Sequence, residues 1–324
     1  MVDRGLLYKE WKQHQALFLV VFFLLFLSTP FSIINDYFSY QSCMEYYSND
    51  CQFYFDYSLG GSLQFFWAPG VLLAIVQLGL ERSKGVLDFT LSLPYSRSQV
   101  YHTKFLMGGM VLVGAQLLGY LLSKLLFIFL QPGRVDFFDH YMIGSIVISL
   151  MAYALVMAAG AITGNIFAQL LTSFSVTILP FLILVLPVLN LEVIIGHELF
   201  LERFPIVDNP IWQYLIPIIY VDPHWVQESK YILLIPAAMC MLFYLIGFFS
   251  FIYHPSERSG SFFLWKQLDR PIQVLVIILG VLAFGYAGYS TSQSLFGYVI
   301  GMIIGAIIGF LISYFAIYKK TKHL

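Results

Sequence analysis

The stretch "ALFLVVFFLLFLSTPFSII", residues 16–34, decides the class of fold. It carries no charged side chain and is long enough to cross a membrane, because a helix of about 20 apolar residues spans a hydrocarbon core about 30 Å thick. No small-x-small cleavage site follows it, so we expect it to stay in the protein as an anchor and not to be removed as a signal peptide. The sequence therefore predicts a membrane protein.

The composition of the whole chain agrees with this prediction. Hydrophobic residues make up 59% of the chain, aromatic residues 18% and charged residues only 11%, whereas about 25% of the residues in an ordinary soluble domain are charged. Uninterrupted apolar runs of span length occur eight times, near residues 16–34, 62–80, 105–131, 141–161, 170–190, 231–253, 272–290 and 295–318. We therefore predict an all-α polytopic membrane protein with eight transmembrane helices and short interfacial helices.

The positions of Lys and Arg predict which side of the membrane each loop occupies, because basic loops are retained in the cytoplasm. If the N-terminus is inside, the outer loops hold only Arg134, Arg203 and Lys230, and nearly all the other basic residues lie on the inner side. An even number of spans then places both termini in the cytoplasm. Residues 81–104 form an inner loop, and residues 35–61 and 191–230 form the two long outer loops.

Two of the three cysteines, Cys43 and Cys51, lie in the first outer loop. The outside of a cell is oxidising and the spacing closes a small ring, so these cysteines are candidates for a disulfide. Two unpaired thiols remain the alternative. Cys240 lies inside a predicted span and is expected to be a small buried apolar side chain.

The sequence lacks the motifs of a membrane enzyme or an ATPase. Residues 197–202, "HELFLE", begin like the zinc motif HExxH, but Leu201 stands where the second histidine is needed. No GxxxxGK[ST] phosphate-binding loop occurs, so any energy from ATP must come through a partner chain. We expect no catalytic site, no metal, no cofactor of its own and no nucleic-acid partner.

Lys124 is the only charged residue within the predicted spans. It lies near the outer end of the third span, so its long side chain can reach the lipid headgroups. The alternative is a role in a substrate pathway, because charged residues at membrane depth often mark function.

The last predicted span contains a regular series of glycines. Four of them repeat at four-residue intervals and therefore lie on one helix face, where another helix can approach closely: Gly297, Gly301, Gly305 and Gly309. The partner helix can belong to the same chain or to a second subunit.

The inner loop at residues 81–104, "ERSKGVLDFTLSLPYSRSQVYHTK", holds six charged residues between two long apolar runs. Its apolar residues fit a helical spacing at Val86, Phe89 and Leu93, and they also fit a two-residue alternation, so periodicity does not choose between helix and strand. Pro94 discourages continuation of a helix, and Ser96 with Gln99 fits a capping box that starts a new one. We predict a short amphipathic element, a turn and a capped entry into the third span. The element can lie on the anionic membrane surface or in a groove of a soluble partner.

This loop resembles the one between the second and third spans of ABC-2-type transporter permeases. The family pattern is matched by Glu81, Gly85, Leu87, Asp88, Leu93, Pro94, Ser96, Arg97 and Lys104. The N-terminal "LLYKEWKQHQ", residues 6–15, also resembles the family's interfacial helix, with Leu7, Tyr8 and Trp11 expected on one side and Lys9, Lys12 and Gln13 on the other.

The resemblance implies a permease subunit, an exporter by analogy, whose inner loop docks on a separate ATP-binding subunit that holds ATP and magnesium. Two permease chains, identical or related, are then expected to form one path across the membrane. In that docked loop we expect Leu87, Phe89 and Leu91 to provide apolar contacts and Glu81, Arg82 and Arg97 to provide charged edges.

The same resemblance implies a single transmembrane domain over residues 1–324. It consists of an interfacial helix at 1–15, a six-span core at 16–253, an inner linker at 254–271, and two additional spans with a basic tail at 272–324. Length, span plan and N-terminus are similar to the permeases of the Ytr-type operons of Gram-positive bacilli, which are linked to acetoin use and cell-envelope stress. The plasma membrane of such a bacterium is the expected location. Two alternatives come from other functional classes of membrane protein. One is an ATP-independent channel or envelope scaffold, and the other is an intramembrane enzyme that uses Lys124.

Overall fold

The computed structural model of the chain describes residues 3–46, 51–57, 63–195, 214–220, 231–254, 258 and 260–318. Among these residues, eight helical segments are long and apolar enough to cross a membrane, which confirms the all-α polytopic fold. The long helices are α1 (Arg4–Tyr46), α5 (Arg97–Leu130), α6 (Phe138–Ile162), α7 (Ile166–Ile195), α11 (Tyr231–Tyr253), α12 (Lys266–Ser292) and α13 (Leu295–Tyr318). The second span is built from three consecutive pieces: α2 (Leu63–Ala74), the π-helix η1 (Ile75–Leu80) and α3 (Glu81–Ser83).

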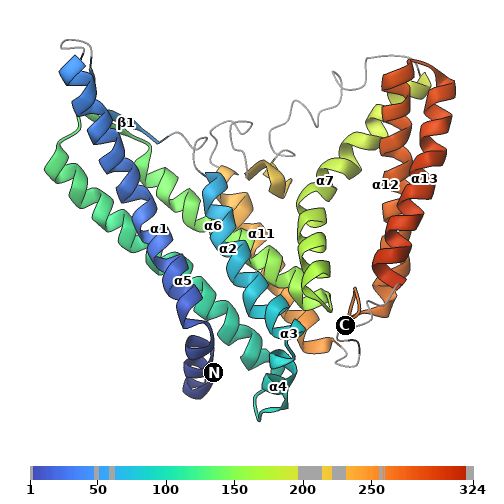
Figure 1. The fold of residues 1–324 in the computed structure, drawn as a ribbon, viewed down its shortest axis with the longest axis horizontal. Coiled ribbons are helices and arrows are strands. Elements are labelled where there is room, and N and C mark those ends of the chain that lie inside the picture. The colour runs from blue at the N-terminus through green and yellow to red at the C-terminus, as the bar shows by residue number, and fades with distance from the viewer. Residues whose placement is uncertain are drawn as a thin grey trace.

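Helix α1 begins well before the first predicted span. Its backbone leaves helical geometry at His14, with φ −117° and ψ 15°, so the predicted interfacial segment forms the first part of α1 on the N-terminal side of this bend. Figure 1 shows the bend between the N-terminal piece and the rest of α1. The interfacial segment therefore keeps its own direction although it is continuous with the first membrane helix.

The inner loop has the predicted architecture. Gly85, with φ 70°, supplies the left-handed turn that leads into the short helix α4 (Val86–Ser92). The side chain of Ser96 accepts a hydrogen bond from the backbone of Gln99, and the Gln99 side chain bonds back to the backbone of Ser96. This confirms the predicted capping box at the start of α5.

Helix α6 is central in the bundle. Every side chain from Met151 to Ala161 is buried, as expected for a helix that is apolar on all sides and surrounded by other helices. It packs against α2, α5, α7 and α11, and α1 packs along α5. In Figure 1, α1 begins and α13 ends on the same side of the molecule as α4.

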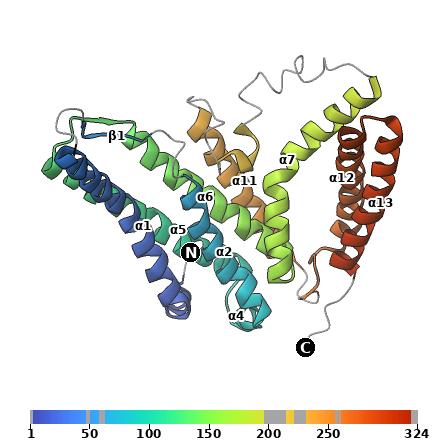
Figure 2. The same cartoon turned by 45° about the horizontal axis from the view of Figure 1, so that its top comes forward.

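Helices α12 and α13 form a hairpin that stands beside this bundle (Figures 1 and 2). The glycine face of α13 packs against α12: a Cβ on Gly301 would overlap the carbonyl oxygen of Phe284, and a Cβ on Gly305 would overlap that of Gly280. The packing partner of the glycine series therefore lies within the chain. The hairpin also contacts α7, where Nδ2 of Asn190 donates to the carbonyl oxygen of Leu282 at 3.1 Å.

The inner linker differs from expectation. Helix α12 begins at Lys266, six residues before the predicted span, so the described part of the linker holds no separate interfacial helix. Its backbone instead pairs with the turn between α6 and α7, through an antiparallel bridge between Thr163 and Phe263. Asp269 lies in the first turn of α12, and its carboxylate is 3.0 Å from the guanidinium group of Arg258.

On the opposite side, two short strands form a parallel pair, β1 (Tyr54–Asp56) with β2 (Arg134–Asp136). A disulfide joins Cys43 at the end of α1 to Cys51 before β1, as predicted. In the second outer loop, α7 continues to Ile195 and the 3-10 helix η2 covers Pro217–Tyr220. The "HELFLE" segment, with His197, Glu198 and Leu201, lies outside the described residues, as do Arg203 and Lys230.

Candidate functional site

The exposed surface of the inner loop is smaller than its sequence suggests. Phe89 is 65% exposed, whereas Leu87 is 1% exposed and Leu91 packs partly against the core. The expectation that all three provide apolar contacts to a partner is therefore wrong for Leu87, because residues two apart in an α-helix point to nearly opposite faces, about 200° apart. The other exposed residues between Glu81 and Lys104 are Ser83, Lys84, Gly85, Asp88, Ser92, Pro94 and Ser96.

The two arginines of the loop bind the ends of other helices of the same chain. Nη1 of Arg82, a buried residue, donates to the carbonyl oxygens of Gly160 and Thr163 at the end of α6. Nη1 of Arg97 donates to the carbonyl oxygen of His254 at 2.5 Å, just after α11. Carbonyl groups at a helix C-terminus lack intrahelical hydrogen-bond donors and carry a partial negative charge. A guanidinium group supplies both the N–H donors and a positive charge.

This arrangement corrects the role expected for the charged residues of the loop. Glu81, Arg82 and Lys104 are buried and bound within the chain, so they do not form the edge of a docking surface. They attach the base of α4 to the surrounding helices.

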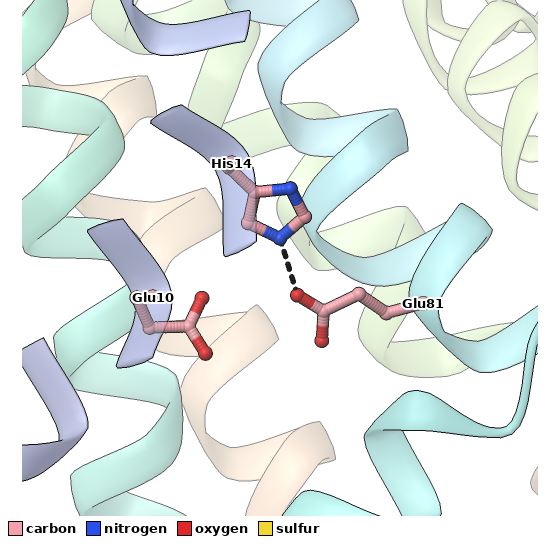
Figure 3. A group of neighbouring side chains, drawn as sticks. All are labelled: Glu10, His14 and Glu81. Carbon is pink, nitrogen blue, oxygen red and sulfur yellow. Dashed lines mark hydrogen bonds and ion pairs between the residues drawn. The ribbon is translucent and has the colours of Figure 1, made fainter. Parts of the chain in front are cut away.

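A buried ion cluster lies where the N-terminal piece of α1, the end of the second span and the start of α5 meet. The ammonium group of Lys104 lies 2.9 Å from both carboxylate oxygens of Glu10 and 2.6 Å from Oε2 of Glu81. Nε2 of His14 lies 2.5 Å from Oε1 of Glu81 (Figure 3). A buried charge is costly unless it is paired, and here each carboxylate has a cationic or imidazole partner.

The cluster connects directly to α4. Lys9 bridges Oε1 of Glu10, at 3.2 Å, and Oγ1 of Thr90 in α4, at 2.6 Å. The chain of contacts therefore runs from α4 through Lys9 and Glu10 to Lys104 at the start of the third span.

Glu10, His14 and Glu81 bring three potential metal ligands together, with donor atoms within 4.8 Å of one another. Figure 3 shows the two carboxylates and the imidazole turned toward one another. The ammonium group of Lys104 already holds the position between the carboxylates at 2.6–2.9 Å. A metal ion there would meet a fixed positive charge, so the arrangement fits an ion-pair cluster better than a metal centre.

A second set of polar contacts lies next to the cluster, around the π-helix η1. The hydroxyl group of Tyr153 lies 2.6 Å from Oε1 of Gln77 and 2.9 Å from the carbonyl oxygen of Lys104, so two acceptors share its single proton. Nε2 of Gln169 in α7 donates to the carbonyl oxygen of Ala74 at 3.2 Å. In a π-helix each backbone hydrogen bond reaches one residue further than in an α-helix. The carbonyl oxygen of Ala74, directly before η1, therefore receives an additional hydrogen bond from a side chain.

The interfacial segment packs through a different face from the predicted one. Its buried side chains are Leu6, Glu10 and His14, with Leu7 and Trp11 half-buried at the edge. Tyr8 is exposed, and Lys12 lies over its ring at 5.8 Å. The prediction failed because a charged residue, Glu10, lies at the centre of the buried face.

Lys124 lies at the far side of the molecule from this cluster. Its ammonium group is 2.6 Å from Oδ1 of Asp139 and lies over the rings of Tyr120 and Phe138. The side chain is 42% exposed and paired near the C-terminal end of α5, so it is not buried in the bundle.

Sequence reasoning missed Glu10, His14, Gln77 and Gln169 as members of the site. A signal for the first two was present, because Leu6, Glu10 and His14 follow one another at four-residue intervals and so share a helix face. Gln77 stands alone in an apolar run, where an amide needs a hydrogen-bond partner, whereas Gln169 comes directly before the fifth predicted span.

No protein-family model matches the chain. It is 56% identical over 328 aligned residues to a protein of Bacillus subtilis (strain 168) described as probable ABC transporter permease YtrC, with 99% of this chain and 100% of the relative covered. It is 52% identical to a second protein of the same bacterium, described as probable ABC transporter permease YtrD, over the full length of both. Identity at this level over whole chains, together with eight membrane-spanning helices, shows that the chain belongs to the ABC transporter permeases of the bacterial plasma membrane.

Proposed function

We propose that this permease docks a separate ATPase subunit through α4, with Phe89 at the centre of the contact. The observation that carries the proposal is the exposure of Phe89 on a short helix whose opposite face is buried. The residues at the base of this helix are bound to α1, α5, α6 and the end of α11. An exposed aromatic side chain with charged neighbours is typical of an interface anchor. Lys84 and Asp88, which flank Phe89, supply charges of both signs for orientation.

The contacts at the base of α4 support a route for coupling. The ATPase subunit holds ATP and magnesium, and its closure on ATP displaces α4. Arg82 and Arg97 carry this displacement to the ends of α6 and α11, and the Lys9–Glu10–Lys104 chain carries it to α1 and α5. The permease itself contributes no catalytic group.

The positive-inside count supports a cytoplasmic position for α4, where such an ATPase would be located. We further propose that two permease chains form one transport path. The two relatives from one bacterium are both described as permeases, which is consistent with a pair of related chains. Outward transport rests on the resemblance to exporters.

The test replaces Phe89 with Asp and purifies the tagged protein gently from native membranes. We expect a co-purifying ATPase with vanadate-sensitive hydrolysis for the wild-type chain, and a loss of at least about tenfold in bound ATPase for Phe89→Asp, because a central interface anchor contributes 2 kcal/mol or more. Phe137→Asp is the matched control, since Phe137 is 55% exposed at the opposite end of the molecule. Equal amounts of ATPase with both variants would contradict the docking surface, and a wild-type chain that elutes alone would favour a channel or scaffold.

A further inference from the structure

A pocket of about 970 Å³ lies at the end of the bundle that carries the disulfide, opposite α4 (Figure 1). It is formed by the end of α1, the residues around β1 and the connection between α5 and α6. Its walls include irregular, partly exposed backbone at residues 52–53 and 131–133. Irregular backbone that is exposed to lipid does not occur in the hydrocarbon region, so the pocket lies outside it, within reach of water-soluble ligands.

Five aromatic side chains line the pocket: Tyr37, Tyr40, Phe53, Tyr54 and Phe137. The ring of Phe53 stacks on Tyr40, with 5.0 Å between the centroids, and meets Tyr37 at 5.4 Å. Tyr54 is 58% exposed and Phe137 is 55% exposed. Apolar surface of this kind, rimmed by polar groups, is typical of a ligand-binding groove.

Two residues of the pocket have a strained backbone. Gln131 has φ 48° and Phe137 has φ 56°, a left-handed conformation that is uncommon for residues with a side chain and especially for a bulky one. The ring of Phe137 is largely exposed, so packing inside the chain returns little for this strain. Strained residues cluster at ligand sites, where the conformation presents a side chain to the ligand.

The polar groups of the pocket are mostly neutral. Gln52 and Gln131 contribute side-chain amides, and Tyr40 and Tyr54 contribute hydroxyl groups. None of these four groups has a hydrogen-bond partner among the described residues. Each of them can both donate and accept a hydrogen bond, so together they suit a ligand that is rich in hydroxyl groups.

The charges in the pocket neutralise each other. Among the described residues that line it, only Arg134 and Asp136 are charged, and Nε of Arg134 lies 2.6 Å from Oδ2 of Asp136. A strongly charged ligand would have to separate this pair or leave its own charge unpaired. The walls therefore favour an uncharged ligand.

The two segments that carry these groups are held in a fixed relation. The backbone N–H of Gly133 donates to the carbonyl oxygen of Phe53 at 2.8 Å, and β1 pairs with β2 directly after these residues. The disulfide fixes Cys51, two residues before Phe53, to the end of α1. The pocket is thus formed before a ligand arrives, which reduces the entropy that binding must overcome.

The matching ligand has flat apolar faces and a rim of hydroxyl groups, which is the shape of a cyclic sugar. The C–H groups on a sugar face are attracted to the negative face of an aromatic ring, and the hydroxyl groups bond with amides and phenols. We infer that this pocket binds a neutral oligosaccharide, with sugar rings against Tyr54 and Phe137 and hydroxyl groups bonded to Gln52 and Gln131.

The test titrates cellotetraose into the full chain in phospholipid nanodiscs and follows binding by isothermal titration calorimetry, with empty nanodiscs as the blank. The equatorial hydroxyl groups of cellotetraose leave both faces of each ring apolar. Sorbitol is the matched probe, because it carries hydroxyl groups but has no ring face. We expect saturable binding of cellotetraose and an affinity for sorbitol that is lower by about tenfold or more, because sorbitol cannot stack.

Two variants assign the binding to this pocket. Tyr54→Ala should weaken cellotetraose binding about fivefold by removing a ring, whereas Tyr54→Phe keeps the ring and should retain most of the affinity. Gln131→Gly keeps a residue that adopts positive φ readily but removes the amide, and it should also weaken binding about fivefold. Tyr46→Ala is the control, since Tyr46 is 79% exposed near the same end of α1 and does not line the pocket.

Thermal unfolding checks that each variant keeps its fold. Absence of saturable cellotetraose binding, as expected if phospholipid headgroups occupy the pocket, would overturn the inference. Equal affinities for cellotetraose and sorbitol would do the same, as would unchanged affinity in both Tyr54→Ala and Gln131→Gly. Binding of the sugar needs no partner chain, so the result is independent of ATPase docking at α4.

Discussion

The ammonium group of Lys104, at the start of the third span, lies 2.6 Å from the carboxylate of Glu81, at the end of the second, and both side chains are buried. The α4 loop joins these two residues, so the ion pair closes the loop at its base. Glu10 adds a second carboxylate at 2.9 Å and ties the N-terminal piece of α1 to the same point. Three helix ends are thus held together by one ammonium group.

Removal of Lys104 should destabilise the protein strongly. Lys104→Met leaves two buried carboxylates without their shared cation, which typically costs about 3–5 kcal/mol. The free energy of unfolding in mild detergent measures this loss. The triple variant Glu10→Gln, Glu81→Gln, Lys104→Met removes all three charges and should recover most of the stability. A triple variant no more stable than the single one would show that the charges themselves are needed.

Substitution on the glycine face of α13 should separate the final hairpin. A side chain at Gly301 overlaps the backbone of Phe284, so Gly301→Val must push α12 and α13 apart, at a cost of about 1–3 kcal/mol. Thermal unfolding monitors the effect. Gly114→Val is the control, because a Cβ at Gly114 meets nothing within 4 Å, and its midpoint should stay close to that of the wild-type chain. Similar losses in both variants would contradict the packing shown here.

His254 should make stability depend on pH. Burial, with Arg82 and Arg97 nearby, lowers the pKa of His254 to about 4, while its ring donates to the carbonyl oxygen of Phe251. The folded state therefore keeps the ring neutral, whereas the unfolded chain takes up a proton below about pH 6.5. Stability from this group is complete above pH 6.5 and is lost as the pH falls toward 4, by about 2.5 kcal/mol at pH 4.5.

The measurement compares the free energy of unfolding at pH 7.5 and pH 4.5 for the wild-type chain and for His254→Gln. Glutamine stays neutral at both values and can still donate to Phe251. The variant should lose less stability on acidification than the wild-type chain does. An identical loss in both would assign the acid sensitivity to other groups.

The disulfide should report the side of the membrane on which the β1–β2 pair lies. In intact cells of a Cys240→Ala strain, a maleimide that cannot cross the membrane should label the protein only after treatment with an impermeant reductant. The reason is that Cys43 and Cys51 are bonded to each other and are expected outside. Labelling that requires permeabilised cells would reverse the predicted orientation.

The sequence predicted the elements that depend on local chemistry. Span lengths follow from the thickness of the membrane and the cost of burying a polar backbone, so eight apolar runs indicate eight helices. The capping box at Ser96 and the close pair of Cys43 and Cys51 also depend on residues near one another in the chain, and both are present. The glycine series of α13 predicted a packing face but left its partner open.

The tertiary structure decided where each charge belongs. Glu10, Glu81 and Lys104 are far apart in the sequence, and each one alone is indistinguishable from a charge that flanks a membrane span. Burial of these charges becomes favourable only when the folded helices bring opposite charges within hydrogen-bond distance. The same holds for α4, where Leu87 and Phe89 look equivalent in the sequence, but the packing of the helix on its neighbours buries one and leaves the other exposed. Apolar length alone thus determined that the chain crosses the membrane eight times, whereas only the contacts between distant helices determined which residues remain available to a partner.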